Sequence, residues 1–340
     1  MDAAKRFDLI RRNTAEILTE EELQKLLAAK KKPAVYLGTA ITGKPHVGYF
    51  VWALTMADFL RAGFRVRLLL ADLHGALDNC PWDALEKRYA YYAAVLPLLF
   101  EALGAPLKDI ELVKGSSFQL SKEYMLDVLK AGSLTTVHDA TKAASEVVKL
   151  GEHPKLGGIL YPVMQALDEQ YLDVDVQYGG IDQRKIFVFA RELLPKLGYR
   201  PRVEVMTPLV PGLIGKKMSA SDERSKIDLL DDEATVQKKV EGAYCEEGTV
   251  EDNGVLAFLK YVVMVLKQDH GGQLVVERPA KFGGPVSFAS YDALEEAYAA
   301  KKIHPMDLKS VVAKEVNALL TPFRKRHAGL LRLAKEGYPG

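Results

Sequence analysis

The sequence predicts an α/β fold in which a Rossmann-like, doubly wound parallel sheet is followed by a smaller, mainly α-helical domain. Three observations lead to this prediction. Short apolar runs alternate with helical patterns as far as residue 206, which is the order of βαβ units with parallel strands. Helical patterns dominate after residue 230. The length of 340 residues also exceeds the size at which one core usually stops growing, so we expect domains at 1–228 and 229–340.

The first domain opens with a helical pattern over residues 6–28, where Thr19 and Glu22 form a capping box for the second of two helices. Strand-like runs and helical periodicities then alternate along the chain. The strands are expected at 34–38, 66–72, 110–113, 174–177 and 202–206. The helices are expected at 45–61, 83–103, 156–171 and 182–197, with two more within 121–150.

The second domain shows helical periodicity throughout. Its helices are expected at 232–244, 253–267, 291–301, 305–320 and 322–336. The sequence contains no internal repeat and no low-complexity segment, so we expect a short loop between the two domains.

Composition and charge indicate a soluble globular protein. Hydrophobic residues make up 48% and charged residues 27%, and the apolar runs are too short to span a bilayer. The formal net charge is +1, so any RNA must be bound by local basic patches. The two cysteines, Cys80 and Cys245, lack metal-ligand spacing, so no metal site is expected and a reducing compartment is favoured. An acidic N-terminal segment without an apolar leader core favours the cytoplasm.

The segment Gly-Lys-Pro-His-Val-Gly-Tyr at 43–49 follows a predicted strand and opens a predicted helix. Free backbone N–H groups at a helix start bind phosphates, and Pro45 suits the first helical turn. His46 is therefore expected on that turn as a hydrogen-bond donor, with Gly43 and Gly48 letting a nucleotide approach the backbone. A packed helix start with a surface histidine would explain the same residues without a ligand.

A second segment, Lys-Met-Ser-Ala-Ser at 217–221, follows the Gly-rich stretch 211–215. Lys217 supplies a positive charge, and Ser219 supplies a hydroxyl beyond Met218, on a loop that can close over a triphosphate. Each segment alone is weak evidence. Together and in this order, they indicate the activation of a carboxylate by ATP.

Polar side chains are expected to meet beside the carboxyl ends of the strands. Tyr161, Gln165 and Asp168 share one face of the predicted helix 156–171, since they are spaced i, i+4 and i+7. Solvent exposure would explain this stripe equally well on composition alone. However, Tyr36 and Gln183 lie at strand ends of the same predicted sheet, where open α/β folds bind ligands. We therefore expect one polar pocket.

The two nucleotide segments resemble the H-x-G-H and K-M-S-K-S signatures of class I aminoacyl-tRNA synthetases. Nearly the whole chain resembles the tyrosyl-tRNA synthetases of the archaeal and eukaryotic cytosolic type. The segments that carry this resemblance are Tyr-Pro-x-x-Gln-x-x-Asp at 161–168, Gly-Gly-Ile-Asp-Gln-Arg-Lys at 179–185, Lys-Phe-Gly-Gly at 281–284 and His-Pro-Met-Asp-Leu-Lys at 304–309.

The resemblance implies a tyrosine–tRNA ligase that forms tyrosyl-adenylate and pyrophosphate from L-tyrosine and ATP, with Mg²⁺, and then transfers tyrosine to the 3′-terminal adenosine of tRNA(Tyr). Tyr36 and Asp168 are expected to bind the substrate phenol. Tyr161, Gln165 and Gln183 are expected to hold its amino group. The implied catalytic residues are His46, Lys217 and Ser219, and the implied ATP-binding residues are Gly43, His46, Gly48, Tyr49, Lys217, Met218 and Ser219.

The chain departs from the class signatures at two positions. Tyr49 replaces the second histidine and Ala220 replaces the second lysine, so two potential cations are missing from the phosphate site. The related eukaryotic enzymes resemble this chain in departing there, which indicates a lineage feature. Lys44, Lys216 or a bound monovalent cation could supply the missing charge.

The resemblance also implies contacts with tRNA and a homodimer. Phe282, His304 and Asp307 occupy positions implied to read the anticodon, where an aromatic ring can stack on a base and a carboxylate can accept from guanine. Lys142 is implied to contact the acceptor stem, and the region 120–150 is implied to contribute to the dimer interface. A turn aromatic and a helix-start aspartate would be the explanation without the resemblance.

Three other functions fit parts of the sequence. A tryptophanyl-tRNA synthetase shares the fold and both nucleotide motifs, but an indole N–H is only a donor and does not require Tyr36 together with Asp168. An inactive RNA-binding paralogue is compatible with the two departures, whereas the intact remainder of both motifs favours an enzyme. A small nucleotidyltransferase with the same H-x-G segment would not need residues 230–340.

Overall fold

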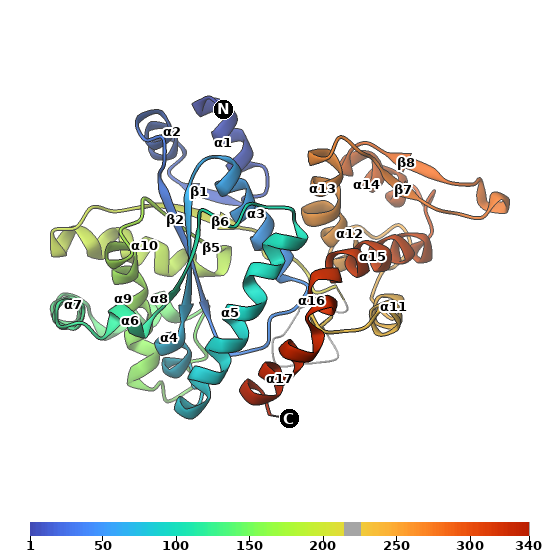
Figure 1. Ribbon diagram of the computed structural model, residues 1–340. Coiled ribbons are helices and arrows are strands. Elements are labelled where there is room, and N and C mark those ends of the chain that lie inside the picture. The colour runs from blue at the N-terminus through green and yellow to red at the C-terminus, as the bar shows by residue number, and fades with distance from the viewer. Residues whose placement is uncertain (214–225, 340) are drawn as a thin grey trace.

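The computed structural model describes residues 1–213 and 226–339 (Figure 1). Within these residues, six strands form the main sheet in the order β1-β6-β5-β2-β3-β4. All neighbours are parallel except β1 and β6, so the predicted parallel sheet is confirmed apart from an antiparallel edge strand. The strands are β1 Glu16–Leu18, β2 Ala34–Ala40, β3 Arg65–Ala71, β4 Ile110–Lys114, β5 Val176–Gly180 and β6 Val203–Thr207.

Helices cover both faces of the sheet, as a doubly wound fold requires. Figure 1 shows α3 and α5 on one side, and α8, α9 and α10 on the other. The adjacent strands β2 and β5 mark the point where the strand order reverses, which is where such folds bind ligands. The helices of this part are α1 Ala3–Arg11, α2 Glu20–Ala29, α3 Tyr49–Arg61, α4 Asp72–Leu77, α5 Leu85–Ala102, α6 Ser116–Gln119, α7 Lys122–Leu134, α8 Val137–Ala144, α9 Leu156–Tyr171 and α10 Arg184–Leu193.

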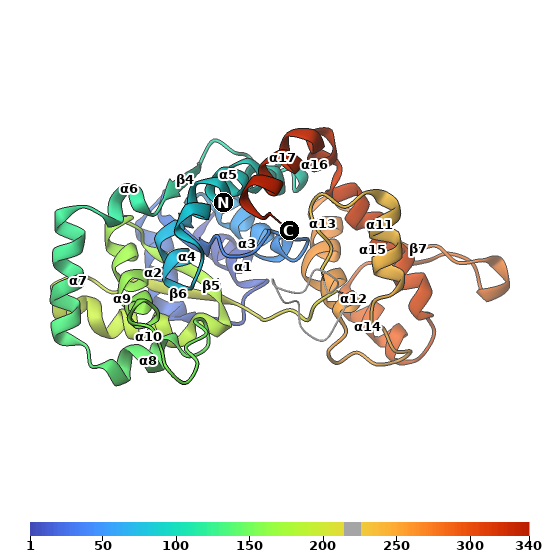
Figure 2. The ribbon, with the colours of Figure 1, turned by 90° about the horizontal axis from the view of Figure 1, so that it is seen from below.

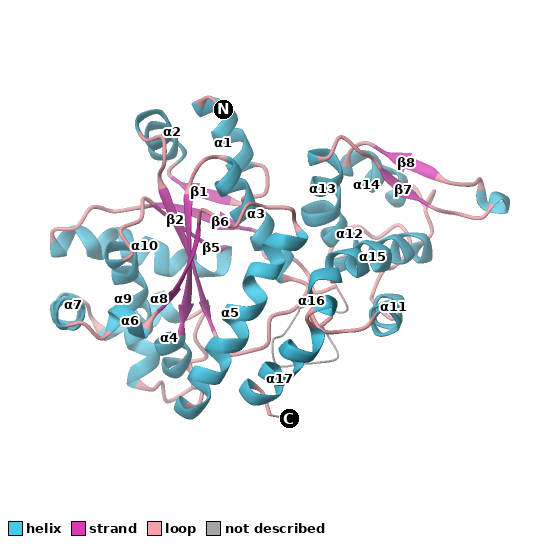
Figure 3. Cartoon of the chain, viewed as in Figure 1, coloured by secondary structure: helices cyan, strands magenta, loops and turns pink. Residues whose placement is uncertain are grey.

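The second part of the chain is mainly helical, as predicted, but it also contains a small antiparallel hairpin (Figure 3). Helix α12 continues through a π-helical turn into α13. The elements are α11 Glu233–Glu241, α12 Gly254–Phe258, α13 Met264–Asp269, β7 Leu274–Val276, β8 Val286–Phe288, α14 Tyr291–Ala299, α15 Pro305–Leu319, α16 Thr321–Lys325 and α17 His327–Gly337.

Three short strands were not predicted from the sequence, and neither were the short helices α4 and α6. The segment between α1 and α2 is not a simple helical connection, because Glu16–Leu18 pairs with β6 at the sheet edge. The β7–β8 hairpin was also missed. Each of these strands has only three residues, too few to display a period-2 pattern.

The last two helices return from the helical part to the sheet part. Both α16 and α17 pack against α5. Phe323 of α16 meets Phe50 of α3 edge to face, with ring centroids 6.4 Å apart. The two parts therefore share one continuous apolar core, and the domain boundary at residue 228 stays a prediction.

A charged cluster adds a second connection between the two parts. Arg12, after α1, contacts Asp58 of α3 and Asp269 of α13, each at 2.6 Å. Arg61 also contacts Asp269 at 2.6 Å. Asp58 is fully buried, so these partners compensate a charge that would otherwise be costly to remove from water.

None of the helices in the described ranges combines the length and apolarity needed to cross a bilayer.

Candidate functional site

The five side chains expected to form a polar pocket line one cavity of about 240 Å³. The cavity lies beside the carboxyl end of β2 and against α9, at the reversal of strand order. Strand β2 and helix α9 therefore position most of the pocket, and the segment after β5 supplies the rest. The predicted residues that line it are Tyr36, Tyr161, Gln165, Asp168 and Gln183.

The stripe on α9 faces the cavity and not the solvent. Tyr161 is 8% exposed, Gln165 8% and Asp168 1%, which excludes the solvent-exposure explanation. The Gln165 side-chain amide donates to Oε1 of Gln183 at 2.8 Å, so helix α9 and the turn after β5 are joined across the pocket. The Tyr36 hydroxyl donates to the Gln165 carbonyl at 3.3 Å, which is long for an O–H···O bond. A ligand hydroxyl can therefore replace that bond.

Asp168 is held by donors that the sequence analysis did not identify. Its Oδ1 accepts from Gln119 Nε2 at 2.8 Å and from the Tyr124 hydroxyl at 2.9 Å. Burial raises the pKa of Asp168 to about 8, although these two hydrogen bonds oppose the rise. Both donors use Oδ1, so Oδ2 is left for a ligand in the cavity. A ligand hydroxyl that donates to Oδ2 would favour the charged form.

His74 of α4 is a further pocket residue that was missed. Its ring packs edge to face on Tyr161, with centroids 4.6 Å apart, and its Nδ1 lies 3.3 Å from Gln119 Nε2. Because Gln119 Nε2 is a donor, Nδ1 accepts and the proton is assigned to Nε2. Nε2 has no hydrogen-bond partner among the described residues and lies 3.7 Å from Asp168 Oδ2. Burial lowers the pKa of His74 to about 4, so the ring is neutral at pH 7.

The nucleotide segment after β2 differs from the prediction in one respect. Helix α3 begins at Tyr49, and His46 precedes the helix and forms a β-bridge with Asp228. The Val47 N–H donates to the Ile227 carbonyl at 3.0 Å, so pairing with a distant segment holds this stretch extended. Pro45 predicted a helix start at this position, but the pairing with residues 227–228 holds the backbone extended instead.

His46 is nevertheless placed as a neutral donor. Its Nδ1 accepts from the Gly48 N–H at 3.2 Å, which assigns the ring proton to Nε2. Burial, with a smaller contribution from the charge of Lys226, lowers the pKa of His46 to about 4. The imidazole can therefore offer a ligand an N–H donor but not a full positive charge.

Tyr49, expected at the ATP site, is packed behind the nucleotide segment. Its hydroxyl lies 3.1 Å from the Tyr92 hydroxyl, and Tyr92 donates to the Gly43 carbonyl at 2.5 Å. The ring also packs edge to face on His46, with centroids 5.3 Å apart. The residue that replaces the second histidine thus supports the backbone of the segment and the ring of His46.

Carbonyls of the same segment are held from outside by α5 and by the residue after α17. Arg88 Nη1 donates to the Thr42 carbonyl at 2.6 Å and Nε donates to the Gly337 carbonyl at 3.0 Å. The Tyr338 hydroxyl donates to the Gly43 carbonyl at 3.1 Å, and the Arg88 guanidinium lies 4.5 Å from the centre of the Tyr338 ring. With its carbonyls held on this side, the backbone between β2 and α3 is fixed.

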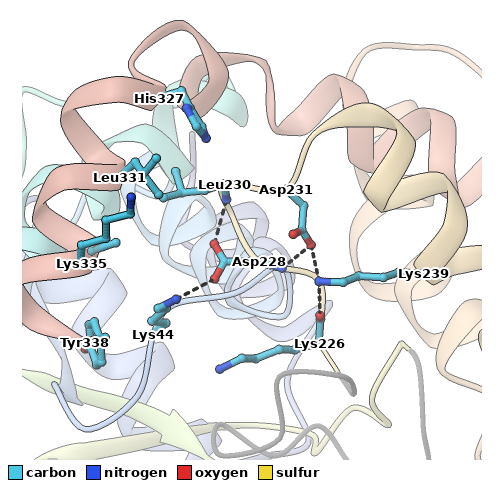
Figure 4. A pocket seen from close by; sticks show the side chains of 11 residues that line it. Lys44, Lys226, Asp228, Leu230, Asp231, Lys239, His327, Leu331, Lys335 and Tyr338 are labelled. Atoms are coloured by element: carbon cyan, nitrogen blue, oxygen red, sulfur yellow. Dashed lines mark hydrogen bonds and ion pairs between the residues drawn. The ribbon is translucent and has the colours of Figure 1, made fainter. Parts of the chain in front are cut away.

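A cavity of about 480 Å³ lies beside this segment, between the 226–231 stretch, α11 and α17 (Figure 4). Lys44 Nζ lies 3.9 Å from Asp228, and Lys239 Nζ lies 2.6 Å from Asp231. Lys44, one of the candidates for the missing charge, is therefore already paired with a carboxylate. Lys216, Lys217, Met218, Ser219 and Ala220 lie outside the described residues.

Three of the residues expected to contact tRNA lie in the helical part of the chain. Phe282 is 60% exposed on the loop between β7 and β8. His304 caps α15 by accepting from the Met306 N–H at 3.2 Å, and Asp307 lies in the first turn. Arg278, which the sequence analysis missed, donates to the Gly284 and Lys302 carbonyls, each at 2.9 Å, and so joins the Phe282 loop to the segment before α15.

Lys142 lies at the other end of the molecule. It lines a surface cavity of about 360 Å³ between α8 and α10. Arg184 and Lys185 line the same cavity, so three basic side chains gather there. The sequence analysis did not single out these two partners, because they come from a different helix.

The family profile described as tRNA synthetases class I (W and Y) matches residues 28–321. The chain belongs to this family. It is 50% identical to the cytoplasmic tyrosine–tRNA ligase of Xenopus tropicalis over 98% of the chain and 63% of that protein. The chain thus spans less than two thirds of the length of the frog relative. It is 43% identical to the tyrosine–tRNA ligase of Haloarcula marismortui, over 100% of the chain and 98% of that protein.

Solved structures of the family agree with this assignment. The tyrosyl-tRNA synthetase of Archaeoglobus fulgidus, complexed with L-tyrosine, has a TM-score of 0.88 and 40% identity, covering 96% of this chain and 100% of that one. The tryptophanyl-tRNA synthetase of Aeropyrum pernix has a TM-score of 0.71 at 17% identity, covering 99% of this chain and 88% of that one. The latter likeness concerns the fold alone.

The neutral state of His74 predicts a specific loss of stability in acid. Its pKa is about 4 in the folded chain, below the ordinary value of 6.5, so the unfolded chain binds more protons between these pH values. From pH 7 to 4.5, His74→Gln should therefore lose less free energy of unfolding than wild type, by about 2–3 kcal/mol. Chemical denaturation at both pH values measures this.

The exposed His138 provides the matched control. His138→Gln should follow the wild-type pH dependence. Parallel curves for wild type and His74→Gln would contradict a neutral, buried His74.

Proposed function

We propose that the chain is a tyrosine–tRNA ligase. The carboxylate of L-tyrosine attacks the α-phosphorus of ATP, which gives tyrosyl-adenylate and releases pyrophosphate. A hydroxyl of the 3′-terminal adenosine of tRNA(Tyr) then attacks the acyl carbon and releases AMP. The observation that carries this proposal is the buried pair of Asp168 and Tyr36 in a pocket beside the nucleotide segment.

A phenol fits this pocket better than the side chains of competing amino acids. The substrate O–H can donate to Asp168 Oδ2 and can accept from Tyr36, so both buried groups are satisfied. Phenylalanine would leave both without a ligand partner. An indole N–H could donate to Asp168 but could not accept from Tyr36. Tryptophan is therefore the weaker candidate.

The substrate amino group has three oxygen acceptors near the mouth of the pocket. The side chains of Tyr161, Gln165 and Gln183 line the cavity together. The bond from Gln165 to Gln183 fixes the amide orientations, so that Gln183 Oε1 is an acceptor on the pocket side. An ammonium group has three donors and no acceptor, which suits this set.

Activation needs positioning and charge stabilisation more than covalent help. His46 would donate to a phosphate oxygen through Nε2, and Gly43 and Gly48 would let the nucleotide approach the backbone. Lys217 would supply a positive charge and Ser219 a hydroxyl to the phosphates. Mg²⁺ would arrive with ATP, because Mg²⁺ is often held mainly by substrate phosphates. A monovalent cation or Lys216 would supply the charge missing at Ala220.

The test is amino-acid-dependent exchange of pyrophosphate into ATP, followed by charging of tRNA. We expect exchange with L-tyrosine and charging of tRNA(Tyr). Exchange with tryptophan in its place would support the tryptophanyl alternative, and no exchange with any amino acid would support an inactive paralogue. We also place the protein in the cytoplasm, as the names of its eukaryotic relatives suggest, which fractionation of its native cells would test.

Removing either partner of the phenol should erode selectivity. Tyr36→Phe and Asp168→Asn each leave the substrate hydroxyl without one partner, so tyrosine should lose about 1–3 kcal/mol of transition-state binding while phenylalanine loses less. The measurement is the ratio of kcat/KM for tyrosine and phenylalanine in the exchange assay. Asp127→Asn, a buried carboxyl on α7 bonded to Tyr171 and Tyr199, is the control and should keep the wild-type ratio. An unchanged ratio in both pocket variants would rule out this assignment.

The helical part is proposed to read the anticodon through Phe282 and Asp307. Phe282→Ala and Asp307→Ala should each weaken charging of tRNA(Tyr) by about 1–3 kcal/mol, the scale of one lost stacking or base contact. Tyrosine-dependent exchange, which needs no tRNA, should stay unchanged. A tRNA altered at its first anticodon base should show a smaller penalty with Asp307→Ala than with wild type. A parallel fall in exchange and charging would instead make Asp307 a structural residue.

A homodimer is proposed through the face formed by α6, α7 and α8. Large apolar side chains are exposed along it, and a contiguous apolar patch is unusual on the surface of a monomer. Figure 2 shows α7 at the end of the molecule opposite the β7–β8 hairpin, so a partner there would leave the proposed anticodon surface open. The exposed residues are Leu120, Met125, Leu126, Leu129, Leu134 and Val137.

Leu129, 69% exposed, provides the test of the dimer. Leu129→Asp should convert a dimer into a monomer of native helix content, as measured by light scattering and circular dichroism. Leu107→Asp, an exposed leucine outside this face, should leave the mass unchanged. A monomeric wild type would overturn the proposal.

A further inference from the structure

A second set of buried polar side chains crosses the sheet beneath the tyrosine pocket. Tyr36, Gln177 and Glu204 are register partners on the adjacent strands β2, β5 and β6, so they point to the same face. Helix α9 lies on that face. Its residue Glu169, directly after Asp168, has its carboxyl within hydrogen-bonding reach of the Glu204 carboxyl. All these side chains are at most 1% exposed.

As ionised groups, these carboxyls would have no donors. Among the described residues, none donates to the side-chain oxygens of Glu169 or Glu204, or to Gln177 Oε1. Two buried carboxylates side by side would cost both desolvation and repulsion. A proton held between them turns one carboxyl into a donor and the other into its acceptor, and leaves a single negative charge.

The positive charges near Glu169 and Glu204 can compensate one negative charge on the pair but not two. The guanidiniums of Arg202 and Arg191 are the cations that face the pair. Arg202 is largely engaged by the Val174 carbonyl at 2.9 Å and Gln170 Oε1 at 2.8 Å. Arg191 is paired with Glu22 at 2.9 Å. Both therefore act on the pair through space and do not replace the missing donors.

We propose that Glu169 and Glu204 share one proton and that this pair is a positioning element, which holds α9 on β6 and thereby sets Asp168 and Gln165 in the tyrosine pocket. The proposal rests on the proposed function, since it concerns how the substrate side chain is recognised. Because Glu169 and Asp168 are adjacent on α9, a shift of the helix at Glu169 would also move Asp168.

Loss of the shared proton at high pH should weaken the contact between Glu169 and Glu204. Burial raises the pKa of Glu169 to about 8, and burial with the nearby charge of Glu169 raises that of Glu204 well above its ordinary value. The Asp168 carboxyl adds to the rise at Glu169, while Arg202 and Arg191 oppose it; Tyr36 is the remaining titratable group that faces the pair. The folded chain thus binds more protons than the unfolded chain above about pH 4.5, and its stability falls as the pH rises through about 8.

Glu204→Gln tests the shared proton because an amide N–H donates to Glu169 at every pH. Asp168 titrates in the same range in both proteins, so the pair is tested by the difference between them: with rising pH, the dissociation constant for L-tyrosine, measured by calorimetry, should rise more in wild type than in the variant. The variant should show a rise at least about three-fold smaller between pH 7 and 9. Its free energy of unfolding should also fall less over the same range. Glu169→Gln is the reciprocal variant and should behave alike.

Asp175→Asn is the matched control, since Asp175 is also a buried carboxyl beside the sheet. Although burial opposes it, the hydrogen bond from Lys30 helps to hold the pKa of Asp175 below its ordinary value, so this group stays ionised across the tested range. The variant should be less stable but should keep the wild-type alkaline profile for tyrosine.

The outcomes separate this proposal from the proposed function. The proposal of a shared proton would be wrong if both glutamine variants kept the wild-type pH dependence of tyrosine binding and of the free energy of unfolding. A change in the unfolding profile alone would overturn the positioning role. If wild type failed to bind tyrosine at all, the proposed function would fail, and with it the positioning role, whereas the unfolding profile would still decide the shared proton.

Discussion

The hydrogen bonding of one buried carboxyl group, that of Asp168, determines how the surrounding elements meet. A carboxyl that is 1% exposed needs donors, and Gln119 and Tyr124 supply them from the segment after β4 and from α7. His74 of α4 bonds the same glutamine, and Tyr36 of β2 bonds the backbone of α9. Elements from three separate stretches of the chain, β2, α4 and 116–134, therefore meet α9 around this carboxyl.

The sheet and its crossover helices could be predicted because each carries its own repeating signal. Helix 156–171 was predicted with the bounds that α9 has, since its apolar and polar faces recur over four turns. The failures have a common physical cause. Helix α3 begins at Tyr49 and not at the predicted Pro45, because the backbone hydrogen bond from Val47 to Ile227 outweighs the local preference of proline for a helix start. Strands of three residues are likewise defined by their partners and not by their own pattern.

The site divides in the same way. Gln165 and Asp168 could be named because they lie along one helix face, and Tyr36 because the chain resembles a known family. His74 and Gln119 carry no comparable signal, since each is an isolated polar residue whose role exists only once α4 and the segment after β4 lie against α9. Sequence spacing identified residues proposed to touch the substrate, but the groups that orient them depend on tertiary contacts.

The hydrogen bonds that hold the Thr42 and Gly43 carbonyls have a consequence for how such chains can diverge. Tyr338 lies 295 residues beyond Gly43, yet the two are bonded directly, with Arg88 between the two parts. The helical part therefore supplies one wall of the support for the nucleotide segment. If recombination exchanged the helical part between relatives, Tyr338 would be separated from Arg88 of α5. The support of the nucleotide segment would be lost unless α5 were exchanged as well. Substitutions in one part at these contacts therefore require matching residues in the other part, although the exposed surfaces of the two parts lie at different ends of the molecule.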